Sequence, residues 1–119
     1  MQLKNVQIEN FIREIQEGAI AELKKSKALS VKAKSAIYRL SKKISEAPET
    51  KAYLEQKQQL GEDLKSGEKK EAEADKEFKE LLEQDSGLQI EKPKIPESDL
   101  LEVLSVDDLM RCDWLFDIE

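Results

Sequence analysis

Residues 30–48 read SVKAKSAIYRLSKKISEAP, and this stretch decides the fold class that the sequence predicts. Its apolar residues recur every three or four positions and form one helix face: Ala33, Ala36, Ile37, Leu40, Ile44 and Ala47. We expect Ser30 to be the N-cap, because its hydroxyl can accept a hydrogen bond from a free backbone N–H. Pro48 lacks a backbone N–H, so we expect one helix to end before it and the next to begin there.

The same spacing predicts helices on both sides of this stretch. Upstream, a helix is expected from about Asn5 to Lys25, with a bend at Gly18, since glycine weakens a helix by about 1 kcal/mol relative to alanine. Downstream, the seam of the next helix consists of Tyr53, Leu60 and Leu64 and resumes at Phe78, Leu81 and Leu82. Between these two parts, residues 65–77 carry Gly67 and no large apolar residue, which fits either a solvated helix or a hinge loop.

The last third of the chain changes in character. Gly87 ends the helical pattern, and Leu88 to Ile95 alternates apolar and charged residues around Pro93, which favours an extended linker or an edge strand over residues 87–97. Ser105 and Asp108 then fit a capping box, so the final helix is expected to begin there. Its inward residues are predicted to be Leu109, Cys112, Leu115 and Phe116. Met110 and Trp114 make its other side apolar too, so this helix needs cover on more than one side.

These elements predict an all-α fold: an antiparallel helical hairpin or coiled-coil-like bundle, with a short extended segment and a closing C-terminal helix. With 119 residues we expect one domain, made of a helical hairpin or bundle (1–86), an extended segment (87–97) and a C-terminal helical segment (98–119). Hydrophobic residues make up 39% of the chain, against roughly 45–50% in ordinary globular domains. We therefore expect a narrow apolar seam rather than a thick core, and a homo-oligomer that buries it.

Charge is sorted along the chain rather than mixed. Residues 21–57 carry ten Lys/Arg against four Asp/Glu, whereas residues 58–119 carry eight against nineteen. The whole chain has a net charge of −6 and a pI of about 4.9. A basic helical stretch followed by an acidic half favours surface contacts with other molecules.

Several kinds of chemistry are disfavoured by the composition. The sequence has no histidine, which removes Ser-His-acid and Cys-His nucleophile systems and the commonest transition-metal ligand. It has no glycine-rich phosphate-binding motif, and a single cysteine with carboxylates is a poor zinc set. We therefore expect no enzyme, no catalytic or metal-binding residues and no cofactor.

The setting expected from the sequence is the cytoplasm. Cys112 is the only cysteine, so the fold does not depend on an intrachain disulfide. No run approaches the roughly 18 apolar residues of a membrane span, and the first residues, MQLKN, lack the apolar part of a signal peptide. No membrane partner is expected.

The basic stretch is one candidate binding surface. Its cations are Lys24, Lys25, Lys27, Lys32, Lys34, Arg39, Lys42 and Lys43. They fit a solvated face or docking site for an acidic partner, a nucleic-acid-binding stripe, or a face that pairs with the chain's own acidic half. Because only one of them is arginine and only Tyr38 offers a stacking ring, the first reading is favoured.

The C-terminal aromatic residues are the second candidate. Trp114 and Phe116 either close the helical core or act as hot-spot residues at an interface, where tryptophan is enriched. The residues that we expect to contact a partner are Trp114, Phe116, Met110, Lys32, Arg39, Lys42 and Lys43.

Several short segments together resemble small helical proteins encoded by phages and prophages, whose function is unknown. They are Leu3-Lys4-Asn5, Val31 to Tyr38, Phe78 to Leu82, Ile90 to Ile95, and Leu104 to Leu109 ahead of Trp114. The resemblance implies a viral gene and a non-catalytic role inside the host cell, and it assigns no binding residues. The expected function is that of an accessory or assembly protein that docks to another phage or host protein, including inhibition of a host protein. The alternative is a nucleic-acid-binding accessory factor that uses the basic stripe.

Overall fold

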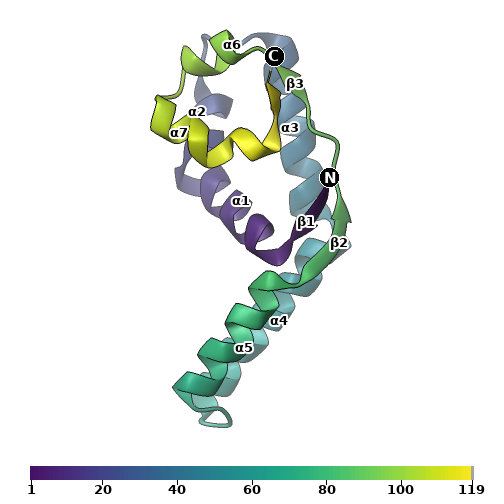
Figure 1. The fold of residues 1–119 in the computed structure, drawn as a ribbon, viewed down its shortest axis with the longest axis vertical. Coiled ribbons are helices and arrows are strands. Elements are labelled where there is room, and N and C mark those ends of the chain that lie inside the picture. Colours follow the sequence, from purple (N-terminus) through teal and green to yellow (C-terminus); the bar gives the residue numbers. More distant parts are fainter. Residues whose placement is uncertain (119) are drawn as a thin grey trace.

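Two long helices project as an arm from a head that holds the rest of the chain (Figure 1). The computed structural model describes residues 1–118, which extend over 50 × 24 × 19 Å. About 70% of the chain is helical, so the predominantly helical fold is confirmed. Two small sheets are present as well: the extended linker or edge strand expected at residues 87–97 contributes to both, whereas the strands that pair with it were not expected.

The head and the arm contain different helices. The head holds α1 (Asn5–Glu17), α2 (Ala19–Lys25), α3 (Val31–Glu46), α6 (Glu97–Leu101), α7 (Val106–Cys112) and the short 3-10 helix η1 (Asp113–Leu115). The arm consists of α4 (Pro48–Ser66) and α5 (Glu71–Glu83), which pack side by side. Strand β1 (Gln2–Lys4) pairs antiparallel with β2 (Asp85–Gln89), and β3 (Lys94–Ile95) pairs parallel with β4 (Asp117–Ile118).

Helix α3 begins and ends where the sequence predicted. The Ala33 N–H donates to the Ser30 hydroxyl over 3.2 Å, so the predicted N-cap is confirmed. Pro48 occupies the first turn of α4, where its missing N–H costs little. The buried Thr50 hydroxyl donates to the Ile44 carbonyl over 2.6 Å, which satisfies a free carbonyl at the end of α3.

The helix expected from Asn5 to Lys25 has the predicted ends, but at Gly18 the chain does not merely bend: it breaks into two helices, α1 and α2. The Glu14 carboxylate folds back over Gly18 and accepts a hydrogen bond of 2.7 Å from the Ala19 N–H. A Cβ atom at position 18 would collide with the Glu14 carboxylate in this position. Glycine therefore leaves room for a side chain that caps the second helix.

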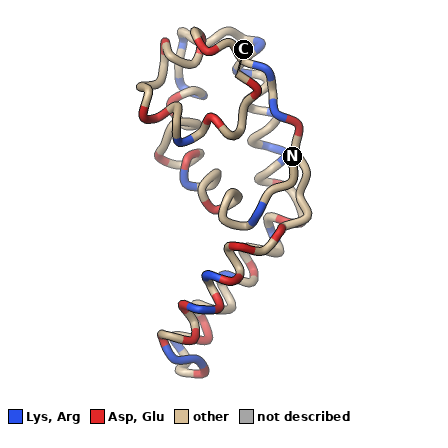
Figure 2. Tube along the Cα trace, viewed as in Figure 1, with Lys and Arg blue, Asp and Glu red and all other residues tan. Residues whose placement is uncertain are grey.

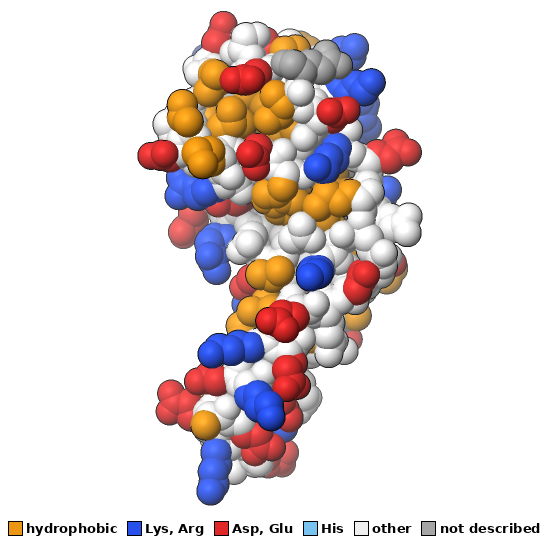
Figure 3. Space-filling model, viewed as in Figure 1, with side chains coloured by type: hydrophobic (Ala, Val, Ile, Leu, Met, Phe, Trp, Pro, Cys, Tyr) orange, Lys and Arg blue, Asp and Glu red, His pale blue; other side chains and the backbone are white. Residues whose placement is uncertain are grey.

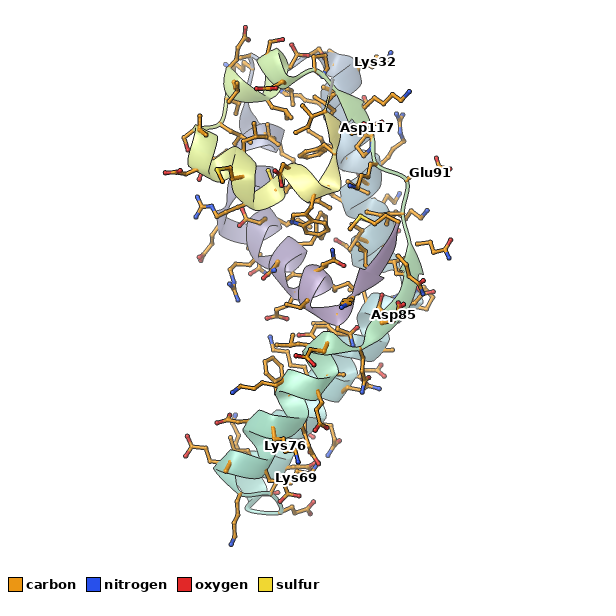
Figure 4. All side chains as sticks on the ribbon, viewed as in Figure 1. Lys32, Lys69, Lys76, Asp85, Glu91 and Asp117 are labelled. Carbon is orange, nitrogen blue, oxygen red and sulfur yellow. The ribbon has the colours of Figure 1, made fainter. Side chains whose placement is uncertain are left out.

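Residues 65–77, which the sequence left open between helix and loop, contain a tight turn between two helices. Helix α4 ends at Ser66, and Gly67 adopts the left-handed conformation with φ of 80°, which glycine accepts without strain. Beyond the turn, Lys69 forms ion pairs with Asp63 on α4 and Glu77 on α5. These ion pairs join the two helices near the tip of the arm, where Figure 4 labels Lys69.

A polar cluster fastens the arm to the head. The Glu9 carboxylate on α1 accepts hydrogen bonds of 2.7 Å from the Tyr53 hydroxyl and from the Lys57 ammonium group on α4. Burial disfavours the charged form of Glu9, but these two hydrogen bonds and the charges of Lys57 and Arg13 outweigh it and lower the pKa of Glu9. The ionised carboxylate therefore stabilises the contact between α1 and α4.

The extended segment is attached to the head at both ends by strand pairing, of β2 with β1 and of β3 with β4. Gly87 lies inside β2 with φ of 82°, so the prediction that it ends a helix is wrong: α5 already ends at Glu83. Strand β1 was not foreseen, because three residues are too few to show an alternating pattern. The C-terminal segment is also not helical throughout, since after η1 the chain extends to pair with β3.

The head has one continuous core, so the expectation of only a narrow seam is wrong. Completely buried residues come from β1, α1, α2, α3, α6 and the C-terminal segment, and include Leu3, Phe11, Leu23, Ile44, Leu100 and Leu115. The predicted inward residues of the last helix, Leu109, Cys112, Leu115 and Phe116, are all buried. The low hydrophobic content is compatible with this core because much of the charge lies on the arm, where few residues are buried.

Candidate docking surfaces

Helix α7 is apolar on two adjacent faces, of which only one is covered. Its inward residues Leu109 and Cys112 are 9% and 0% exposed. Its outward residues Val106 and Met110 are 64% and 67% exposed. Because they lie four positions apart on a helix, their side chains are neighbours on one surface.

Trp114 continues this outward surface into η1. Its indole N–H donates to the Arg111 carbonyl over 3.1 Å, which fixes the ring against the end of α7. The ring also packs partly against the core, so Trp114 is only partly exposed. Trp114 therefore contributes both to the core and to the surface, which is compatible with both alternatives from the sequence: closing the core and contacting a partner.

The outward side chains form one apolar surface, which we call the α7 patch. It comprises Leu101 at the end of α6 and Val103 after it, together with Val106, Met110 and Trp114. Figure 3 shows hydrophobic side chains gathered over α6 and α7, with acidic side chains among them. An exposed apolar patch with a polar rim is typical of a protein-interaction site.

The surroundings of the α7 patch are acidic. Residues 97–118 contain seven carboxylates and a single base, Arg111. Arg111 forms an ion pair with Asp108, whose backbone N–H donates to the Ser105 hydroxyl over 3.2 Å. This N-cap confirms the predicted start of the helix. The rim of the patch therefore carries excess negative charge.

Phe116 does not belong to the α7 patch. It was predicted as a partner contact, but it is only 3% exposed and packs in the core. The prediction is corrected because the chain turns from η1 into β4 at this point, which directs the ring inward.

Cys112, the last residue of α7, is completely buried in the core. Burial raises the pKa of its thiol to about 12, and the negative charges of Glu14 and Asp113 add to this shift. The thiol is therefore protonated at neutral pH, and it acts as a small apolar side chain of the core.

A second surface lies between α3 and the extended segment that joins β2 to β3. Three adjoining open depressions, of about 720, 280 and 480 Å³, share Arg39 and together form what we call the α3 groove. Its cations are Lys32, Arg39, Lys42 and Lys43 on α3, Lys92 on the extended segment and Lys94 at the start of β3. Four of the predicted partner residues are thus brought together here. Figure 2 shows the basic residues of this edge of the head.

The remaining cations of the predicted basic stripe lie elsewhere. Lys24, Lys25, Lys27 and Lys34 line none of the three depressions. The sequence missed Lys92 and Lys94, because they are some fifty residues away from α3 along the chain. Pairing of β3 with β4 and of β2 with β1 is what holds this segment against the head.

The chain does not neutralise the α3 groove itself. Within residues 1–118, none of its six cations forms an ion pair or a side-chain hydrogen bond. The same holds in that range for the other members of the basic stripe, so pairing with the chain's own acidic half is absent from this structure. The charge of this face is available to other molecules.

Two further features bear on the sequence predictions. Among the described residues, no group of three or more Cys, Asp or Glu side chains is arranged to hold a metal ion. No described helix is long and apolar enough to cross a membrane. The absence of enzymatic activity and of a cofactor stays a prediction.

Comparison of the chain with protein-family models, curated proteins and solved structures finds no match. The resemblance to phage-encoded helical proteins therefore stays a prediction, and the surfaces must be interpreted from their own chemistry.

Proposed function

We propose that this chain is a non-enzymatic accessory protein that docks to another protein through the α7 patch. In this proposal it works inside a cell as a phage-type assembly factor or as an inhibitor of a host protein. The partner presents an apolar surface with basic residues around it. The observation that carries the proposal is the exposure of Val106 and Met110 on a helix whose other face is fully used by the core.

Burial of the α7 patch by a partner is energetically favourable. Burying one exposed Val or Met side chain stabilises a complex by about 1.5–3 kcal/mol. Trp114, held by the hydrogen bond to Arg111, loses little conformational freedom when a partner covers it. The acidic rim increases the rate of association with a basic partner and disfavours acidic ones.

The test is copurification from expressing cells, with nuclease treatment, using the wild-type chain and the Val106→Lys and Met110→Lys variants. A lysine in the patch removes apolar contact and repels a basic partner. We expect one stoichiometric protein with the wild type and its loss with each variant. Met and Lys have similar helix propensities, so Met110→Lys leaves α7 intact.

The chain offers a matched control for Val106. Val31 is also exposed, at 80%, and also follows a serine N-cap at the start of a helix. Val31→Lys therefore imposes the same helix-dipole cost on a surface outside the patch. Equal loss of the partner in Val31→Lys and Val106→Lys, or recovery of nucleic acid alone, would contradict the proposal.

A further inference from the structure

The α3 groove carries a local charge opposite to that of the whole chain. The chain has a net charge of −6, yet six cations line the groove and stay unpaired within residues 1–118. Four carboxylates also line it: Glu46, Glu49, Glu91 and Asp99. The excess of cations makes the groove suited to a negatively charged ligand.

The shape of the groove limits the form of that ligand. It follows α3, whose 16 residues span about 24 Å. Buried residues from α3 and β2, including Leu40 and Leu88, line it together with small residues such as Ala36. An extended peptide covers about 3.3 Å per residue, so about seven residues match this length.

We infer that the α3 groove binds an extended acidic peptide segment of a protein partner. Side chains of an extended peptide point alternately to opposite sides. Acidic residues at every second position therefore share one side of the peptide, where they face the four cations of α3, while the small residues between them face the segment from β2 to β3. Figure 4 shows Lys32 on α3 and Glu91 on the extended segment along this edge of the head.

The positions of the carboxylates favour a peptide over a nucleic acid. Each depression contains a carboxylate: Glu46 and Glu49 lie at one end of the groove, Glu91 in its centre and Asp99 at the other end. A polynucleotide carries a negative charge at every phosphate and would meet these carboxylates, whereas a peptide can place neutral residues there. In addition, no aromatic ring lines the three depressions, and stacking on such rings is a main source of single-strand affinity.

The test is fluorescence anisotropy with a labelled eight-residue peptide in which glutamate alternates with alanine. The comparison probes are the same peptide with glutamine for glutamate, and a labelled eight-nucleotide oligothymidine. The groove variant combines Arg39→Glu and Lys43→Glu, two exposed residues that the central depression contains. The matched control combines Lys76→Glu and Lys79→Glu, exposed on α5 of the arm, so its net charge is the same.

We expect the glutamate peptide to bind and the glutamine peptide to bind at least about tenfold more weakly, as expected when several charge contacts are lost. The groove variant should lose about tenfold or more in affinity, and the arm control should stay within about twofold. Tighter binding of oligothymidine than of the glutamate peptide would overturn the inference in favour of nucleic acid. Absence of binding, or equal loss in both variants, would also overturn it.

This inference does not depend on the α7 patch. Met110→Lys should bind the glutamate peptide as the wild type does, because Met110 lines none of the three depressions. Failure of the docking proposal and failure of the peptide proposal are therefore distinguishable.

Discussion

Replacing Leu3 by alanine tests whether the short N-terminal strand is a structural part of the head. Leu3 is 0% exposed, although it lies in a strand of only three residues. The change deletes three carbon atoms, which removes about 2.4 kcal/mol of transfer free energy at about 0.8 kcal/mol each. The cavity left behind adds to this loss, so we expect the free energy of unfolding to fall by about 3 kcal/mol.

The assay is urea unfolding followed by circular dichroism, with a thermal scan beside it. For a domain of this size, about 3 kcal/mol corresponds to a fall in Tm of about 12 °C. The matched control is Leu54→Ala on α4, where the leucine is 39% exposed, and it should cost well under half as much. If Leu3→Ala and Leu54→Ala destabilise the protein equally, β1 is not part of the core and the reasoning is refuted.

Four further substitutions or measurements check other parts of the fold. Gly18→Ala should displace the Glu14 carboxylate from the Ala19 N–H and lower stability by about 1 kcal/mol in urea unfolding, the usual cost of a lost helix cap; an unchanged midpoint would contradict this. Ser41→Ala should raise stability by about 0.5–1 kcal/mol in the same assay, because the buried Ser41 hydroxyl has no hydrogen-bond partner within residues 1–118 and alanine favours the helix; a loss of stability would argue against it. Cys112, with its pKa raised to about 12 by burial, should react with a thiol reagent only after unfolding in urea, so rapid reaction of the native protein would be inconsistent with its placement. Because the pKa of Glu9 is lowered in the fold, its contribution to stability is present above its unfolded pKa of about 4.5 and is lost as the pH falls through the folded value. The stability difference between the wild type and Glu9→Gln should therefore shrink between pH 7 and pH 3, and a constant difference would refute the role of the ionised carboxylate.

The sequence predicted helix ends correctly at residues whose side chain or backbone has a specific effect on a helix terminus. Ser30 and Ser105 cap helices because a hydroxyl can reach a free N–H, and Pro48 begins a helix because it has no N–H to lose. The sequence did not predict the turn at Gly67, because residues 65–77 are compatible with either a helix or a loop.

What the sequence could not show are contacts between distant segments. Leu3 is buried because β1 pairs with β2, more than eighty residues away. Lys92 and Lys94 join the α3 groove only because short strands hold their segment beside α3. Phe116 was expected both on the inward face of the last helix and as a partner contact, and only the inward position is confirmed; periodicity alone could not show that the chain leaves the helix before it.

The most direct test of the docking proposal is photo-crosslinking from position 110. A photoreactive amino acid replaces Met110 in one sample and Leu54, on the arm, in the other, and both are irradiated in expressing cells. The account predicts a crosslink to one protein from position 110 and none to that protein from position 54. Crosslinks to the same protein from both positions, or from position 54 alone, would contradict the assignment of the α7 patch as the docking surface.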